Sequence, residues 1–309
     1  MVWITCQEMN APAELHGKEA NRIAVWQSVA RTIAECDGYR HPHSAHQWVL
    51  DVTTRPLGHE PWHNWFALQG GHRNYGLTPQ TRYKGYYDFL PTRPMLETEA
   101  MYERVDCGGL STTDDTRRAA WKAVLCGSPG YSYGGAGIWA LKWDENDPRW
   151  EKYNRAIAAW HEGMSLPGAA QMTILKKFFT AINWTALTPR FQDAAWSEWH
   201  DVERCVLATI SNQLYVVYCY GATSKGILKQ LDTSTSYVGR WFDVRNAKYV
   251  RTPLRISTAT GAWVVPEKPS TEDWILLVEK HTNTAQRMNS TTAIQTPRQS
   301  VGDDRKPVP

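Results

Sequence analysis

The stretch RPMLETEAMYE, residues 93–103, indicates the fold of the first part of the chain. Its Pro94, Met95 and Leu96 form a short apolar run, and acidic residues follow directly. A short apolar run bounded by turn residues fits a buried strand. Acids just after such a strand are typical of parallel sheets, in which functional groups collect beyond the carboxyl ends of the strands.

Helical and strand patterns alternate on both sides of this stretch. Helical spacing of apolar residues predicts a helix over 17–36. Asp114 and Asp115 at the start and Gly127 after the end favour a helix over 114–125, and helices are also expected over 79–90 and 168–182. Short apolar runs predict strands over 2–8, 46–52, 64–72, 93–103 and 128–139. Strands that alternate with helices predict βαβ units and a parallel sheet.

The pattern changes at about residue 196, where short strand-like runs follow one another without a helical period. This predicts a C-terminal antiparallel β-sandwich domain. The polar stretch 285–309 predicts a disordered tail. We therefore divide the chain into an α/β domain over 1–190, an all-β domain over 191–284, and the tail.

Composition narrows the class of protein. Hydrophobic residues make up 42% of the 309 residues, which permits a large core, and the net charge of +3 gives no electrostatic case for nucleic acid. No apolar run approaches the roughly 20 residues of a membrane span. The six cysteines show no metal-binding spacing, so we expect buried free thiols, with disulfides as the alternative. The 16 tryptophans suit contact with carbohydrate.

Polar residues recur where the predicted strands end. They are Gln7 and Glu8, Gln69 and His72, Glu97, Glu99 and Glu103, and Tyr131 and Tyr133. Two carboxylates about 5–5.5 Å apart on one sheet edge could hydrolyse a glycosidic bond with retention. An isolated glutamate at a strand end is also typical of a solvated loop or a helix cap. We expect Glu97 and Glu103 to be exposed charges of that kind, and HPHSAH (41–46) to be a hydrogen-bonded loop rather than a metal site.

Several segments resemble the apiosidase-like glycoside hydrolases. RPMLETEAMYE is similar to their seventh-strand motif, in which Glu99 matches the nucleophile and Tyr102 its neighbour. CGSPGYSYGGAGIW (126–139) resembles their eighth strand, and LPGAAQMTILKKFF (166–179) their last barrel helix. GRWFDVRNAKY (239–249) and EDWILLVEK (272–280) look like the collagen-binding-type β domain that often follows the barrel.

The resemblance implies a partial (β/α)8 TIM barrel, covering about strands 4 to 8, with a fold of the α/β class. VWITCQE (2–8) then falls on the fourth strand, and Glu8 takes the role of acid/base. Substrate contacts are implied for residues at the strand ends, namely Trp3, Gln7, His46, Gln69, His72, Tyr102, Tyr131, Tyr133 and Trp139. His43 is a weaker candidate beside His46. No metal and no other cofactor is implied, since two carboxyl groups suffice.

The chain also departs from the family pattern. Gln7 stands where related barrels often have Asn, and Gly130-Tyr131 stands where they often have Gly-His. Both positions hold substrate, so the resemblance does not carry the sugar specificity. A full barrel takes about 250 residues, and we expect the first three βα units to be absent and this chain to hydrolyse little or nothing alone.

These features favour a retaining glycosidase acting on a plant-type or related glycan, as the activity of a full-length parent. That parent is expected to be extracellular or periplasmic, with an oligo- or polysaccharide as its partner and no membrane span. The alternative is a non-catalytic carbohydrate-binding or cell-surface adhesion protein on the same scaffold. A structural interaction module built on the β domain has the weakest support. A Glu8–Glu99 carboxyl separation near 5 Å would favour the enzyme.

Overall fold

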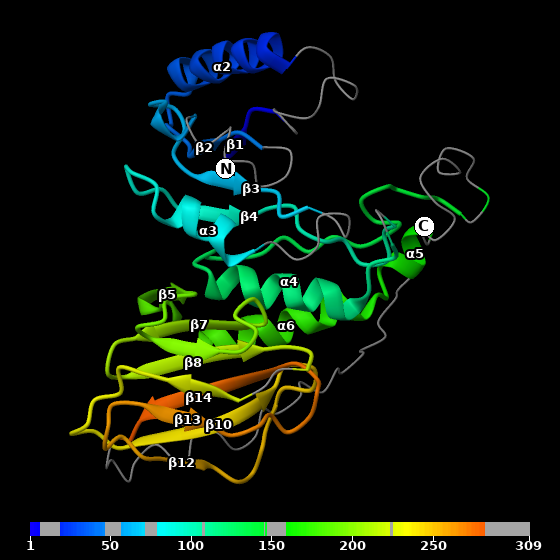
Figure 1. Ribbon diagram of the computed structural model, residues 1–309. Coiled ribbons are helices and arrows are strands. Elements are labelled where there is room, and N and C mark those ends of the chain that lie inside the picture. Colours follow the sequence, from blue (N-terminus) through cyan, green and yellow to red (C-terminus); the bar gives the residue numbers. More distant parts are fainter. Residues whose placement is uncertain are drawn as a thin grey trace, which may run out of the picture.

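The computed structural model describes residues 1–6, 19–46, 57–71, 79–106, 109–144, 146, 159–222 and 225–281. The predicted tail, 285–309, lies outside these residues. Figure 1 shows short strands at one end of the molecule, helices α4 and α6 across its middle, and the C-terminal sheets at the other end.

Parallel strands in chain order form the first region. They are β1 (Trp3–Ile4), β2 (His43–Ser44), β3 (Phe66–Leu68) and β4 (Met95–Glu97). β1 pairs with β2 and β3 with β4, both in parallel. A parallel bridge from His46 to Ala67 joins the two pairs, and another from Glu97 to Tyr131 adds a fifth segment. The five segments therefore place their carboxyl ends along one edge.

Helices connect or follow these strands. They are α2 (Glu19–Cys36), α3 (Gln80–Tyr87), α4 (Thr113–Leu125), α5 (Trp160–Gly163), α6 (Pro167–Thr180) and the 3-10 helix η4 (Trp184–Ala186). The four helices predicted from sequence are confirmed, with shifted ends. α4 begins at a capping box, in which the Thr112 hydroxyl accepts from the Asp115 N–H and the Asp115 carboxylate accepts from the Thr112 N–H. α6 begins with Pro167, whose fixed φ suits a first helical turn.

One strand prediction was wrong in extent, and another falls mostly outside the described residues. Of the strand expected over 46–52 only His46 is described, and it forms a parallel bridge to Ala67, while the described strand β2 lies just before it. Polar His43 and Ser44 are buried there because neighbouring strands bond them, for example through the Ser44 hydroxyl, which accepts from the Ala67 N–H. The strand expected over 128–139 reduces to two bridges, at Tyr131 and Gly135.

The C-terminal region is rich in sheet, as predicted. It contains β5 (Thr188–Phe191), β6 (Ser197–Trp199), β7 (Cys205–Ile210), β8 (Leu214–Cys219), β9 (Gly226–Leu228), β10 (Tyr237–Asp243), β11 (Lys248–Tyr249), β12 (Leu254–Ile256), β13 (Trp263–Val265) and β14 (Trp274–Lys280). The larger sheet has the order β11-β10-β14-β8-β7-β5, with β12 on β10, and the smaller one β13-β9-β6. All these pairings are antiparallel.

Alternating side chains give the larger sheet two buried faces. On β8, Val216 and Tyr218 pack into the cluster that includes Trp121 of α4. Tyr215 and Val217 of the same strand pack into a second cluster with the smaller sheet. The first cluster joins the larger sheet to the helical region in one continuous core, and the second joins the two sheets to each other.

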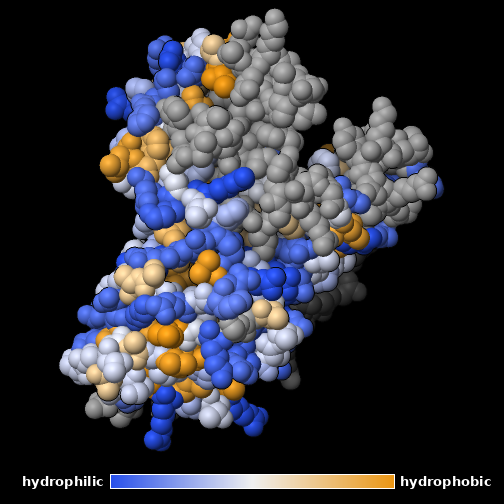
Figure 2. Space-filling view, in the orientation of Figure 1, coloured by the Kyte–Doolittle hydropathy of each residue, from blue (hydrophilic) through white to orange (hydrophobic). Residues whose placement is uncertain are grey.

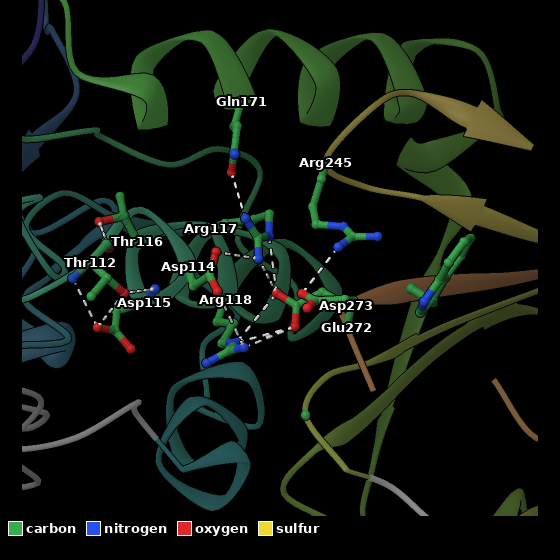
Figure 3. Close-up of polar contacts among 12 residues, drawn as sticks. Thr112, Asp114, Asp115, Thr116, Arg117, Arg118, Gln171, Arg245, Glu272 and Asp273 are labelled. Atoms are coloured by element: carbon green, nitrogen blue, oxygen red, sulfur yellow. Dashed lines mark hydrogen bonds and ion pairs between the residues drawn. The ribbon is translucent and has the colours of Figure 1, made fainter. Parts of the chain in front are cut away.

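A buried ion-pair cluster also joins the two regions, and Figure 3 shows Arg117 and Arg118 of α4 both directed at Asp273. The Arg117 guanidinium donates to Asp273 Oδ2 at 2.7 Å, with both side chains almost fully buried. Arg118 and the Tyr218 hydroxyl also donate to this carboxylate. Five donor groups thus satisfy the buried Asp273 carboxylate, two from each arginine and the Tyr218 hydroxyl.

The described cysteines are all free. Four of them are buried as predicted, namely Cys6, Cys126, Cys205 and Cys219, whereas Cys36 is exposed. In the described part of the chain, every helix is too short or too polar to cross a membrane. On the face shown in Figure 2, hydrophilic residues interrupt the hydrophobic ones over both regions.

Candidate active site

Glu99 lies at the carboxyl edge of the parallel strands. Its side chain is largely buried, at 8% exposure for the residue, and its Oε2 is 3.4 Å from His46 Nε2. His46 follows β2, and its own N–H donates to the Cys6 carbonyl, which follows β1, at 3.2 Å. The Glu99 N–H donates to the Leu68 carbonyl at the end of β3. Four neighbouring strand ends therefore meet around this carboxylate.

Glu97 is fully buried, so the expectation that it is an exposed rim charge was wrong. The Gly70 N–H donates to its Oε1 and the Tyr83 hydroxyl to its Oε2, each at 2.8 Å. These donors explain how a carboxyl group can be buried at the end of β4. Burial nevertheless raises the pKa of Glu97 to about 7, against the lowering effect of both hydrogen bonds, and nearby Glu99 adds a smaller rise.

Tyr131 lies across from Glu97 in the fifth parallel segment. Its hydroxyl is buried and has no hydrogen-bond partner among the described residues. Burial raises the pKa of Tyr131 well above its usual value, and the Glu97 charge adds to this. A neutral phenol is therefore present beside Glu97, and its hydroxyl, which has no partner among the described residues, can donate to a bound polar group.

Glu103 was also expected to be exposed, and it is 1% exposed. Its carboxylate accepts from the Thr113 hydroxyl, from the Tyr133 hydroxyl at 2.7 Å and from the Gly168 N–H at 2.9 Å. A Cβ on Gly168 would stand 2.2 Å from Glu103 Oε2, so glycine is needed for this approach. Tyr133, a predicted substrate contact, is thus hydrogen-bonded to Glu103, which joins the glycine-rich segment to the first turns of α4 and α6.

Tyr102 and Trp139 lie together, with ring centroids 6.0 Å apart. A Cβ on Gly134 would stand 2.0 Å from the Tyr102 ring, so the glycine-rich segment is fitted to this tyrosine. This close approach explains why 128–139 does not continue as a regular strand. Trp139 is 43% exposed, and Gln69 at the end of β3 is buried.

Trp3 and His43 are not brought to this cluster. The Trp3 indole N–H donates to Asp37, which lies in the loop before β2. That loop is at the amino end of the strands, opposite the edge where Glu99 lies. His43 contacts the Thr5 hydroxyl within the sheet, and burial lowers the pKa of its imidazole.

Gln7, Glu8 and His72 lie outside the described residues. Their roles therefore stay predictions, and so does the pairing of Glu8 with Glu99. Residues that sequence reasoning missed are the donors that hold Glu97 and Glu103, above all Tyr83 and Thr113. Within the described chain, no group of three or more His, Cys, Asp or Glu side chains is arranged to hold a metal ion.

The chain is similar in sequence and in fold to known proteins. The family model described as "Apiosidase-like, catalytic domain" matches residues 1–186. A solved structure described as a glycoside hydrolase superposes with a TM-score of 0.67 at 20% identity, over 84% of this chain and 61% of that one. A glycoside hydrolase family 5 protein from Bacteroides vulgatus ATCC 8482 gives 0.66 at 19% identity, over 84% and 59%.

These structural likenesses show the fold. The chain spans about three fifths of the length of the two structures that it matches. No curated protein matches it.

Proposed function

The chain belongs to the family of apiosidase-like catalytic domains, and from this premise we propose that the whole protein is a retaining glycoside hydrolase. Glu99 is the nucleophile and Glu8 the acid/base in this proposal. The observation that carries it is the position of the Glu99 carboxylate at the carboxyl edge of the parallel strands, with His46 beside it. Catalytic groups of parallel βα folds collect at that edge.

The proposed reaction has two steps. Glu99 attacks the anomeric carbon while Glu8 protonates the leaving oxygen, which gives a covalent glycosyl-enzyme and a free alcohol. Water then attacks the same carbon, with Glu8 now accepting its proton, and Glu99 leaves as a carboxylate. The product keeps the anomeric configuration of the substrate.

Two features of the described residues support these roles. Cys6 stands two residues before Glu8, and its carbonyl accepts the N–H of His46, whose ring contacts Glu99. Cys6 therefore lies at the same edge of the parallel strands as Glu99, two residues before Glu8 in the sequence. Glu97, with its pKa of about 7, is mostly neutral below that pH. It therefore adds little repulsion to a Glu99 carboxylate in mildly acidic solution.

The unsatisfied Tyr131 hydroxyl supports a polar substrate. A buried donor without a partner costs free energy until a ligand or water accepts its hydrogen bond. A sugar hydroxyl or ring oxygen could do so. We propose an oligo- or polysaccharide of plant type or a related glycan as the substrate.

The test is hydrolysis by the full-length protein across a panel of glycans, with Glu99→Gln as the variant. Gln is isosteric but cannot attack the anomeric carbon, so we expect turnover to fall by about 10³-fold or more. NMR of the first products should show the retained anomer. Full turnover by Glu99→Gln would refute the nucleophile, and an inverted product would refute the two-step mechanism.

A non-catalytic carbohydrate-binding protein is the second candidate function. The exposure of Trp139 beside Tyr102 favours it as much as it favours the enzyme, since both need an aromatic face for the sugar. Glycan binding without turnover by the full-length protein would favour this alternative.

A further inference from the structure

We propose that Trp143 and Trp160 form, together with Trp139, an aromatic platform that binds the neutral glycan chain next to the candidate active site. This inference rests on the proposed function for its substrate class. It adds Trp143 and Trp160 as binding residues for sugar units beyond the one that reacts.

The exposure of the three indoles is the first observation. Among the described residues, four tryptophans are exposed, and three of them belong to the platform. Trp139, Trp143 and Trp160 are exposed at 43%, 69% and 39%. Most large aromatic rings of this chain pack into its cores, so three exposed indoles within one short region indicate a surface that contacts something else.

The second observation is that the platform is held in place. Trp143 and Trp160 lie against each other, with ring centroids 6.3 Å apart and planes inclined by 38°. The Trp160 N–H donates to the Lys142 carbonyl at 2.8 Å, which fixes α5 to the segment before Trp143. A Cβ on Gly163 would stand 2.3 Å from the Ala136 carbonyl oxygen, so α5 packs directly on the turn that carries Trp139. A fixed surface loses little entropy on binding.

The platform is continuous with the candidate active site. Trp139 contacts Tyr102, which follows Glu99 by three residues on the loop after β4. A glycan whose reacting unit lies at Glu99 would therefore meet Tyr102 and Trp139 first. Trp143 follows Trp139 by four residues, Trp160 packs on Trp143, and α5 packs on the turn that carries Trp139. In the proposal a longer chain continues from Trp139 onto these two rings.

Charge at the platform favours a neutral ligand. Glu162 lies on α5, two residues after Trp160, and faces Arg104 at 3.8 Å, so these two charges offset. Lys142 and Asp144 flank Trp143 in the chain and also carry opposite charges. Such a pair can bond sugar hydroxyls but offers no excess positive charge for an acidic polymer. The C–H face of a pyranose stacks on an indole while its hydroxyls stay hydrated. In Figure 2, hydrophobic and hydrophilic residues lie side by side near the place that α5 occupies in Figure 1.

Calorimetric titration of the full-length protein tests the platform. The protein carries Glu99→Gln so that the ligand is not consumed, and the probes are hexasaccharides of β-1,4-glucose, β-1,4-xylose, β-1,4-mannose and α-1,4-galacturonate. We expect at least one neutral hexasaccharide to bind, and W143A/W160A to weaken it about 10-fold or more. The variant W143F/W160F keeps a stacking face, so it should lose only about 3-fold.

Tyr39→Ala is the matched control, because Tyr39 is 88% exposed and lies on the loop after α2. It should bind like the parent. The single variant Trp143→Ala removes the most exposed platform ring, so it reports on binding even if the double variant folds poorly.

Three results would overturn the platform: no binding of any neutral hexasaccharide, equal binding by W143A/W160A, or tighter binding of the galacturonate. Failure of the proposed function has a different signature. If the protein with Glu99 intact shows no turnover while platform-dependent binding persists, the hydrolase is wrong and the platform stands.

Discussion

At the scale of single residues, the carboxyl groups of Glu97, Glu99 and Glu103 show how differently one short stretch can use the same side chain. The Glu97 carboxylate accepts hydrogen bonds from the Gly70 backbone N–H and from the Tyr83 hydroxyl. Glu103 is the acceptor for three donors, from the first turns of α4 and α6 and from the glycine-rich segment. Glu99 lies between them with an imidazole beside it. Its two neighbours therefore fix the loop that carries Glu99, the proposed nucleophile.

The raised pKa of Glu97 predicts a pH dependence of stability. Because its pKa is about 7 in the folded protein against 4.5 for the unfolded group, the folded state binds the proton more tightly. Its contribution is complete below about pH 4.5 and is lost as the pH rises to about 7, by about 3 kcal/mol in total. Glu97→Gln keeps the shape and does not titrate, so its free energy of unfolding should lack this fall.

Urea unfolding between about pH 5 and pH 8 measures the effect. As the pH rises, the free energy of unfolding of the wild type should fall relative to that of Glu97→Gln. Glu267→Gln is the control, since that side chain is 75% exposed and should leave the pH profile unchanged. A constant difference across this range would show that Glu97 does not titrate there.

The hydrogen bonds to Glu103 predict a cost in stability when this carboxylate is removed. Glu103→Leu removes the acceptor for Thr113, Tyr133 and Gly168 and leaves these donors buried, so we expect a loss of about 3 kcal/mol or more. Glu103→Gln keeps one acceptor oxygen and should lose clearly less. Chemical denaturation of both variants gives the comparison, and equal losses would mean that volume rather than hydrogen bonding decides the cost.

The sequence could predict that Glu99 follows the end of a strand, but not that Glu97 and Glu103 are buried. An apolar run followed by acids is a local signal, and it located the end of β4. The burial of Glu97 depends on Tyr83 and Gly70, which lie 14 and 27 residues away. The burial of Glu103 depends on Gly168, 65 residues away. No spacing within the stretch reveals such donors, because they come from other elements of the fold.

At the scale of elements, the first turn of α4 contains the residues that fix where this helix begins. Thr112 and Asp115 satisfy each other's backbone N–H groups, and Asp114 and Asp115 place negative charge at the positive end of the helix dipole. The same helix buries Trp121 against Phe178 and Phe179 of α6. Its cap therefore fixes where a central packing face begins.

Loss of this cap should be measurable. Thr112→Ala removes the acceptor for the Asp115 N–H, and we expect the free energy of unfolding to fall by about 1 kcal/mol. Thr112→Ser retains a hydroxyl and should stay close to the wild type. Thermal and urea unfolding of the two variants would settle the point, and an equal loss in both would indicate that the Thr112 methyl group matters instead.

Elements with a local period were the ones that sequence could predict. The apolar spacing of α2, α4 and α6 repeats every turn, so each helix was found without knowledge of its partners. β2 was not predicted because its two residues are polar, and only contacts with the neighbouring segments show that they belong in a sheet. The glycine-rich segment after Tyr131 was misread because its contact with Tyr102 is not local.

At the scale of the whole molecule, α4 connects the parallel strands to the C-terminal sheets. Its buried Arg117 pairs with Asp273, just before β14, across the core that both regions share. Ion pairs of this kind add little net stability compared with apolar packing, but the loss of one partner leaves a buried charge. The cluster therefore makes the relative position of the two regions specific.

Asp273→Ala should weaken this connection strongly. It leaves the buried Arg117 without its main counter-charge, and we expect a loss of about 3–5 kcal/mol. The loss should appear as separate unfolding transitions when tryptophan fluorescence and far-UV circular dichroism are followed in urea, because the two regions no longer share a closed interface.

Glu279→Ala is the matched control, since Glu279 also lies on the sheet and pairs with Arg240 at 2.6 Å, but both side chains are partly exposed. Water can replace that partner, so the expected loss is about 0–1 kcal/mol and the two probes should stay coincident. If Asp273→Ala behaved like Glu279→Ala, the position of the sheets on α4 would depend on apolar contacts alone. The large sheet would then be held through Trp121, Phe178 and Phe242, and not through the arginine cluster.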